Sequence, residues 1–133
     1  MRSIRVFGCF AIVGTIVAVI ASSSVKEIAP TVEAAKPETR CGWFENPTPA
    51  NAWLIDRDGT WVINTQGGSG AVGDWPTFSN SRWVKTNVNY GYGCACMRVE
   101  VDRAEKQILE IFSSYSKPLS SCRKDKWLKD KAK

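Results

Sequence analysis

The first part of the chain contains a long run of hydrophobic positions between two short polar stretches. Residues 6–21 are almost entirely apolar, follow Arg2 and Arg5, and are followed by three serines. A basic start, an apolar run of about 15 residues and small polar residues after it are typical of a cleavable secretory signal. The run is short for the roughly 20 residues that a membrane-spanning helix needs. We therefore predict a signal helix over residues 1–23, with a retained membrane anchor as the alternative.

Composition changes sharply further along the chain. Residues 24–39 are rich in Ala, Glu, Lys and Pro and contain no aromatic residue, whereas every tryptophan and tyrosine lies beyond Arg40. A segment with so little apolar surface cannot build a core. We predict a disordered linker over residues 24–39, one folded domain over residues 40–129 and a basic tail over residues 130–133.

Beyond Arg40, short β-prone runs alternate with turn residues. Residues 53–55 and 60–63 flank Asp56-Arg57-Asp58-Gly59, and an Asp-Gly pair between two such runs predicts a β-hairpin. The two prolines of residues 45–51 predict a fixed loop there. Further strands are expected at residues 40–44, 82–86 and 93–101.

Residues 102–114 fit two structures. Asp102 and Glu105 form a capping box, and the apolar positions 108, 109, 111 and 112 have helical spacing. The same stretch also fits strand, turn and strand, which we favour, with an end at Pro118 and a short terminal helix within residues 121–129. The predicted fold is therefore all-β or β-rich α+β: a small, disulfide-stabilised antiparallel sheet or barrel with a short C-terminal helix.

Four cysteines remain once Cys9 is assigned to the signal segment. An even number in a short exported chain indicates disulfides formed in an oxidising compartment. Strand geometry places Cys94 and Cys96 on one face, so that each reaches a separate partner. We favour Cys41–Cys96 and Cys94–Cys122, with the exchanged pairing left open. A zinc site and a redox-active Cys94-Ala95-Cys96 are the alternatives, although the spacing suits neither.

The charge distribution argues against a nucleic-acid partner. The net charge is +5, but Arg2 and Arg5 belong to the signal segment, and residues 122–133 carry six basic and two acidic side chains, so the body of the domain is close to neutral. The chain has no histidine, which excludes the commonest nucleophile–base pairs. We expect no catalytic residue, no metal and no cofactor.

Aromatic residues are the candidate chemistry. Trp75, Trp83, Tyr90 and Tyr92 lie in or beside glycine-rich stretches, where they could line a groove for a sugar or a peptide because their rings combine an apolar body with a polar tip. The alternative is that these large rings simply fill the core of a small domain.

Several motifs resemble a bacterial exported family that is catalogued only as a domain of unknown function. They are RCGWFENPTPAN (residues 40–51), DRDG (56–59), QGG (66–68), GDWP (73–76), YGYGCAC (90–96) and PLSxCR (118–123). The resemblance covers residues 40–128. It implies a small protein exported by Gram-negative bacteria, and it implies no activity, cofactor or functional residue.

The function expected from the sequence is a non-catalytic periplasmic or secreted binding module for an envelope glycan or an envelope protein. The alternatives are a thiol-disulfide redox protein that uses Cys94 and Cys96, and a membrane-tethered accessory subunit. We expect a monomer that does not bind nucleic acid and that meets a membrane only through the signal segment, if that segment is retained.

Overall fold

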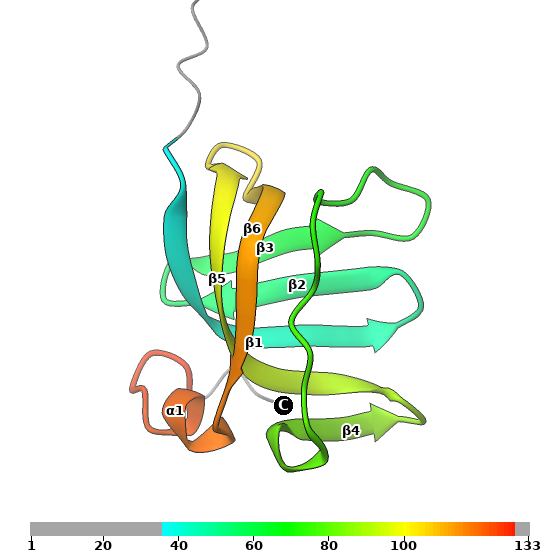
Figure 1. Ribbon diagram of the computed structural model, residues 1–133, viewed down its shortest axis with the longest axis vertical. Helices are drawn as coiled ribbons and strands as arrows, with labels where there is room; N and C mark the ends of the chain where they lie inside the picture. The colour runs from blue at the N-terminus through cyan, green and yellow to red at the C-terminus, as the bar shows by residue number, and fades with distance from the viewer. Residues whose placement is uncertain (1–35, 130–133) are drawn as a thin grey trace, which may run out of the picture. The chain divides into compact units, whose positions relative to one another are not determined.

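The computed structural model describes residues 36–129. The predicted signal helix, most of the predicted linker and the basic tail over residues 130–133 lie outside this range. The elements in chain order are β1 (Glu38–Thr48), β2 (Asn51–Asp56), β3 (Gly59–Asn64), a 3-10 helix (Asn80–Arg82), β4 (Trp83–Asn87), β5 (Tyr90–Asp102), β6 (Gln107–Lys117) and α1 (Leu119–Arg123), as Figure 1 shows. The first strand thus begins two residues before the boundary drawn at Arg40.

The strands form a closed barrel. Their order is β1-β2-β3-β6-β5-β4, and β1 also pairs with β5, so that β1, β2, β3, β6 and β5 close a ring while β4 extends β5 outside it. The strands β1, β2 and β3 follow one another through hairpins, and β5 returns to pair with β1, which makes a Greek key. A five-stranded Greek-key barrel is also the architecture of OB-folds. The β-rich fold with one short terminal helix predicted from the sequence is confirmed.

The barrel closes through few contacts between β3 and β6. These strands run parallel and share one register pair, Val62 with Gln107. Beside it, the loop after β3 fills the gap: the Ala71 amide donates to the Ile63 carbonyl, and Val72 exchanges hydrogen bonds with the backbone of β6. Figure 1 shows this green segment running alongside β6. The loop is therefore part of the barrel wall.

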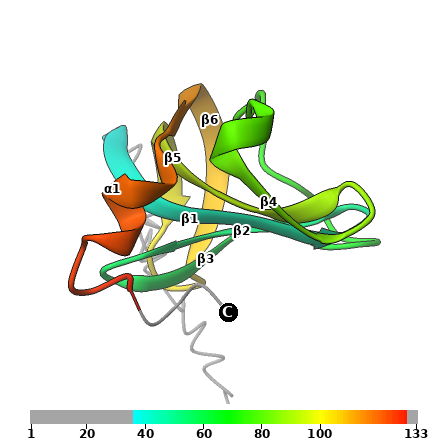
Figure 2. The ribbon, with the colours of Figure 1, turned by 90° about the horizontal axis from the view of Figure 1, so that it is seen from below.

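Two apolar clusters hold the fold together. The larger fills the barrel, and its buried members are Phe44, Ala52, Leu54, Trp61, Ile63, Ala95, Met97, Val99, Val101, Ile108 and Ile111. The smaller comprises Trp43, Cys94, Cys122 and Leu128. Neighbouring residues of a strand point to opposite faces, so that Phe44 enters the barrel while Trp43 packs outside it under the C-terminal segment, where its indole N–H donates to the Leu128 carbonyl at 3.0 Å. Figure 2 shows α1 beside β1 and β5.

The fixed loop predicted over residues 45–51 is wrong for most of its length. β1 continues to Thr48, with Glu45 paired to both Trp53 and Tyr92. A bulge between Glu45 and Thr48 accommodates Pro47, because a proline that cannot donate a ladder hydrogen bond is tolerated at such a position. The true turn is only Pro49-Ala50, between β1 and β2.

The two predicted hairpins are present. β2 and β3 pair antiparallel across Arg57-Asp58, with Asp56 opposite Gly59. β5 and β6 pair from Cys94–Lys117 to Asp102–Gln107, so residues 102–114 form a turn and a strand rather than a helix. The terminal helix begins at Leu119, earlier than expected, because Pro118 ends β6 and stands directly before it.

Two disulfides join the strands and the C-terminal segment. They are Cys41–Cys96 and Cys94–Cys122, the pairs that the sequence analysis favoured. The first links residues directly opposite each other on β1 and β5. Disulfides of this kind place the fold in an oxidising environment. Among residues 36–129, none of the helices has both the length and the apolar composition of a membrane span.

Candidate functional site

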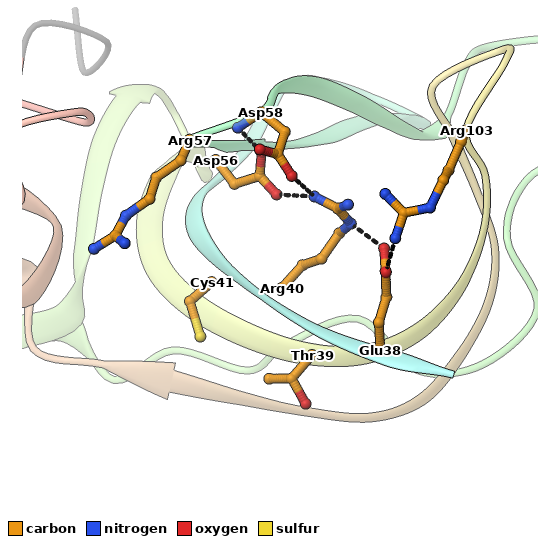
Figure 3. Close-up of a pocket in the computed structure, with 8 residues that line it drawn as sticks. All are labelled: Glu38, Thr39, Arg40, Cys41, Asp56, Arg57, Asp58 and Arg103. Atoms are coloured by element: carbon orange, nitrogen blue, oxygen red, sulfur yellow. Dashed lines mark hydrogen bonds and ion pairs between the residues drawn. The ribbon is translucent and has the colours of Figure 1, made fainter. Parts of the chain in front are cut away.

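A charged cluster closes one end of the barrel. Arg40 of β1 is 6% exposed, and its guanidinium lies 3.6 Å from the centre of the Trp61 ring. It donates to Asp56 at 2.5 Å, to Asp58 at 3.0 Å and to Glu38 at 2.6 Å, as Figure 3 shows. The buried carboxylate of Asp56 also accepts the Trp61 indole N–H at 3.1 Å. The buried charge is therefore paired and hydrogen-bonded, as burial requires.

The pKa shifts in this cluster follow from the same contacts. Burial acts to lower the pKa of Arg40, but its hydrogen bonds to Asp56, Asp58 and Glu38 and the charge of Asp56 together outweigh that effect and raise the pKa above its usual value. The hydrogen bond from Arg40 lowers the pKa of Asp58. The hollow beside the cluster is lined by three arginines and three acids, namely Glu38, Arg40, Asp56, Arg57, Asp58 and Arg103. Because these charges balance and leave no excess charge for a ligand, we interpret the cluster as structural.

The cysteines do not form a redox pair in this structure. Cys94 and Cys96 are each bonded to a different, distant cysteine, so neither supplies the thiolate that disulfide exchange needs. Within residues 36–129, no group of three histidine, cysteine, aspartate or glutamate side chains is arranged to hold a metal ion.

An aromatic groove lies at the other candidate position. It is an open cavity of about 290 Å³. We call it the aromatic groove and define it by its lining: Phe44, Asn46, Trp75, Pro76, Phe78, Asn80, Trp83 and Asn89. Phe44 is 2% exposed and forms the floor, with its ring centre 5.9 Å from that of Trp75 and 5.7 Å from that of Phe78. None of the described residues that line it carries a charge.

The wall of the aromatic groove comes from the segment between β3 and β4. Hydrogen bonds hold this wall on β6: Ser114 donates to the Asp74 carbonyl at 3.1 Å, and Arg82 donates to the Ser116 carbonyl at 2.8 Å. The Phe78 ring fits against β5 because residue 93 is glycine; a Cβ there would lie 2.4 Å from that ring. This contact explains one glycine of the YGYGCAC motif.

The structure separates the four aromatic residues singled out from the sequence. Trp75 and Trp83 line the aromatic groove, and the Trp83 indole N–H donates to the Asn89 carbonyl at 3.3 Å. Tyr92 instead packs edge-on against Trp43, with ring centres 5.4 Å apart, outside the barrel. Tyr90 is half-buried at the start of β5 and does not line the groove.

Sequence reasoning missed the rest of the groove. The sequence does not bring Phe44, Phe78 and the three asparagines of the groove together as a site. No local pattern marks them, because they come from β1, from the loop and from the turn after β4 and meet only in the folded chain.

Together the fold and this groove define a class: a small, disulfide-linked Greek-key barrel with an uncharged aromatic groove on its side. The family model described as "Protein of unknown function (DUF4087)" matches residues 35–129, and the chain belongs to this family. No curated protein and no solved structure matches the chain.

Proposed function

We propose that the protein is exported and acts in the periplasm or outside the cell as a non-catalytic binding module, and that its aromatic groove holds a neutral sugar of an envelope glycan. The two disulfides support a location in an oxidising compartment. The apolar stretch over residues 6–21 supports secretion as the route to it.

The lining of the aromatic groove carries this proposal. A sugar ring presents C–H groups on its faces and hydroxyls around its rim. The groove offers aromatic surface at Trp75 beside the amides of Asn80 and Asn89, and an amide can both donate to and accept from a hydroxyl. An anionic ligand finds no counter-charge among the described lining residues, so a neutral sugar fits better.

The barrel architecture is compatible with this use. OB-folds bind oligosaccharides as well as oligonucleotides, but a fold by itself does not define a function. The lining of the aromatic groove, between the loop wall and β4, is therefore the observation that supports sugar binding.

Titration calorimetry with neutral N-acetylglucosamine and glucose oligomers tests the proposal. We expect Trp75→Ala to weaken binding by about thirtyfold, which corresponds to the roughly 2 kcal/mol that a buried aromatic contact contributes. Trp127→Ala is the matched control, because Trp127 is exposed elsewhere on the surface and should leave the affinity for sugar unchanged.

Two results would contradict the sugar proposal. One is a chain that binds none of the neutral oligomers but binds a purified envelope protein through Trp75, which would favour a protein ligand. The other is sugar binding that survives Trp75→Ala with thermal stability intact, which would place the site elsewhere.

Export has its own test. N-terminal sequencing of the protein recovered from the producing cell should find a chain that starts near residue 24. A chain that retains residues 1–23 and fractionates with membranes would favour the membrane-tethered alternative.

A further inference from the structure

One tryptophan stands apart from the other five. All six lie within residues 36–129, and Trp127 alone is exposed, with 57% of its surface accessible. Its neighbour Leu128 is buried and accepts the Trp43 indole N–H. The backbone is therefore fixed at Leu128, and the neighbouring Trp127 ring points outward from an ordered segment.

Basic side chains surround this ring. Trp127 lines a shallow, open hollow together with Arg57, Ser121, Lys124, Asp125 and Lys126. We call this set the C-terminal surface. The Lys126 ammonium lies 5.3 Å from the centre of the Trp127 ring, and Lys124 and Lys126 are both exposed.

The one acidic residue among the described residues of the C-terminal surface is already engaged. Asp125 accepts the Trp127 amide at 3.0 Å and two hydrogen bonds from Arg57, the shorter at 2.8 Å. The amide of Trp127 and then Arg57 lower the pKa of Asp125, so it stays ionised and paired. Lys124 and Lys126 are left as a positive excess beside an exposed ring.

We propose that the C-terminal surface docks on an anionic lipid membrane. Tryptophan is enriched where bilayer and water meet, because its ring is apolar with a polar edge. Lysines attract the phosphates of an anionic leaflet. A free phosphate group would call for buried, converging donors, whereas these cations are exposed around an open hollow. The proposal is independent of sugar binding in the aromatic groove.

Vesicle sedimentation tests the proposal, with full-length protein and phosphatidylcholine vesicles prepared with and without phosphatidylglycerol. We expect more binding with phosphatidylglycerol than without it, whatever the signal segment adds in both cases, and we expect the phosphatidylglycerol-dependent part to weaken as salt rises. Each basic residue near the surface contributes about fivefold, so Lys124→Glu with Lys126→Glu should weaken partitioning by roughly 25-fold or more. Lys85→Glu is the matched control: an exposed lysine of β4 that does not line the C-terminal surface.

Fluorescence provides a second readout. Residues 1–42 contain no tryptophan, so tryptophan emission reports only on the folded part, even if the signal segment itself binds lipid. We expect a blue shift with phosphatidylglycerol vesicles that disappears in Trp127→Phe. Equal loss of binding in Lys85→Glu, or a blue shift that survives Trp127→Phe, would overturn the proposal. The proposal would also be overturned if the protein bound polyglutamate as strongly as phosphatidylglycerol vesicles and did so without Trp127, since that would indicate an acidic protein partner.

Discussion

Arg40 shows how one buried charge organises the end of the barrel. Its guanidinium is stacked on Trp61 and donates to three carboxylates, and the ammonium of Lys106 lies 4.4 Å from the centre of the same ring. The DRDG motif therefore does more than turn the chain, because both of its aspartates accept hydrogen bonds from Arg40. A buried pair adds little net stability but is costly to break, since one buried charge then loses its counter-charge.

We expect Arg40→Met to destabilise the protein by about 3–5 kcal/mol, because it leaves the buried carboxylate of Asp56 without its guanidinium. Arg57→Ala, which breaks an ion pair in which the arginine is 67% exposed, should cost less than about 1 kcal/mol. Urea unfolding followed by tryptophan fluorescence measures both. Equal losses in the two variants would mean that the Arg40 cluster is not structural.

The lowered pKa of Asp58 makes the stability of the folded protein depend on pH. Its pKa is lowered in the folded protein by the hydrogen bond from Arg40, so the unfolded chain takes up its proton first as the pH falls. The stabilisation is complete above the unfolded pKa of 3.8 and is lost as pH falls through the lower, folded pKa. We expect the melting temperature to fall less between about pH 5 and pH 3 in Asp58→Asn than in the wild type. Identical falls would refute this assignment.

At the scale of the element, two bulges in β6 explain why its apolar residues have the spacing of a helix. Val99 is opposite Ile111 while Arg98 is opposite Ser113, and Val101 is opposite Ile108 while Glu100 is opposite Glu110. Phe112 and Leu109 are thus the extra residues of two bulges. Each bulge turns the inward spacing from two into three, so Ile108 and Ile111 are buried while Leu109 and Phe112 are 42% exposed.

This register predicts different costs for four neighbouring apolar residues. Ile108→Ala and Ile111→Ala should each destabilise by about 2–5 kcal/mol, because each leaves a cavity in the barrel. Leu109→Ser and Phe112→Ser should stay within about 0.5 kcal/mol. Denaturant unfolding of the four variants checks the pattern. Large losses at all four positions would instead favour the helical stripe, in which the four residues share one buried face.

For the whole folded part, the disulfides act on different pieces. Cys41–Cys96 ties two barrel strands across 55 positions of sequence, whereas Cys94–Cys122 ties the C-terminal segment to β5 across 28. A disulfide stabilises mainly by restricting the unfolded chain, and a doubling of the loop adds only about 0.6 kcal/mol. The two bonds should therefore contribute similarly through entropy while protecting different contacts.

We expect removal of either bond by paired Cys→Ser substitutions to cost about 2–4 kcal/mol. Cys94→Ser with Cys122→Ser should in addition expose Trp43, which lies under the C-terminal segment, and so raise its quenching by acrylamide. Cys41→Ser with Cys96→Ser should leave that quenching unchanged below the unfolding transition. The same quenching in both variants would show that the C-terminal segment does not depend on its own bond.

Much of the fold could be predicted because its signals are local. The Asp-Gly turn marks the β2–β3 hairpin, and the period of two along residues 93–101 puts Ala95, Met97, Val99 and Val101 on the face opposite Cys94 and Cys96. The structure shows that this face fills the barrel. Near the prolines the same reasoning failed, because pairing of β1 with β2 and β5 outweighs the local preference of residues 45–48. For the candidate site, the sequence indicated Trp75 and Trp83 but could not separate them from Tyr92.

The amino-acid order alone indicates most of the strands and turns, because a turn residue or an alternation of two acts within a few positions of itself. It also indicates disulfides in an oxidising compartment, since that depends on cysteine number. Tertiary structure was needed for the closure of the barrel, the partners of Arg40, the floor of the aromatic groove under Trp75 and the exposure of Trp127. Each of these depends on contacts between residues far apart in the chain, and such contacts exist only once the strands have paired.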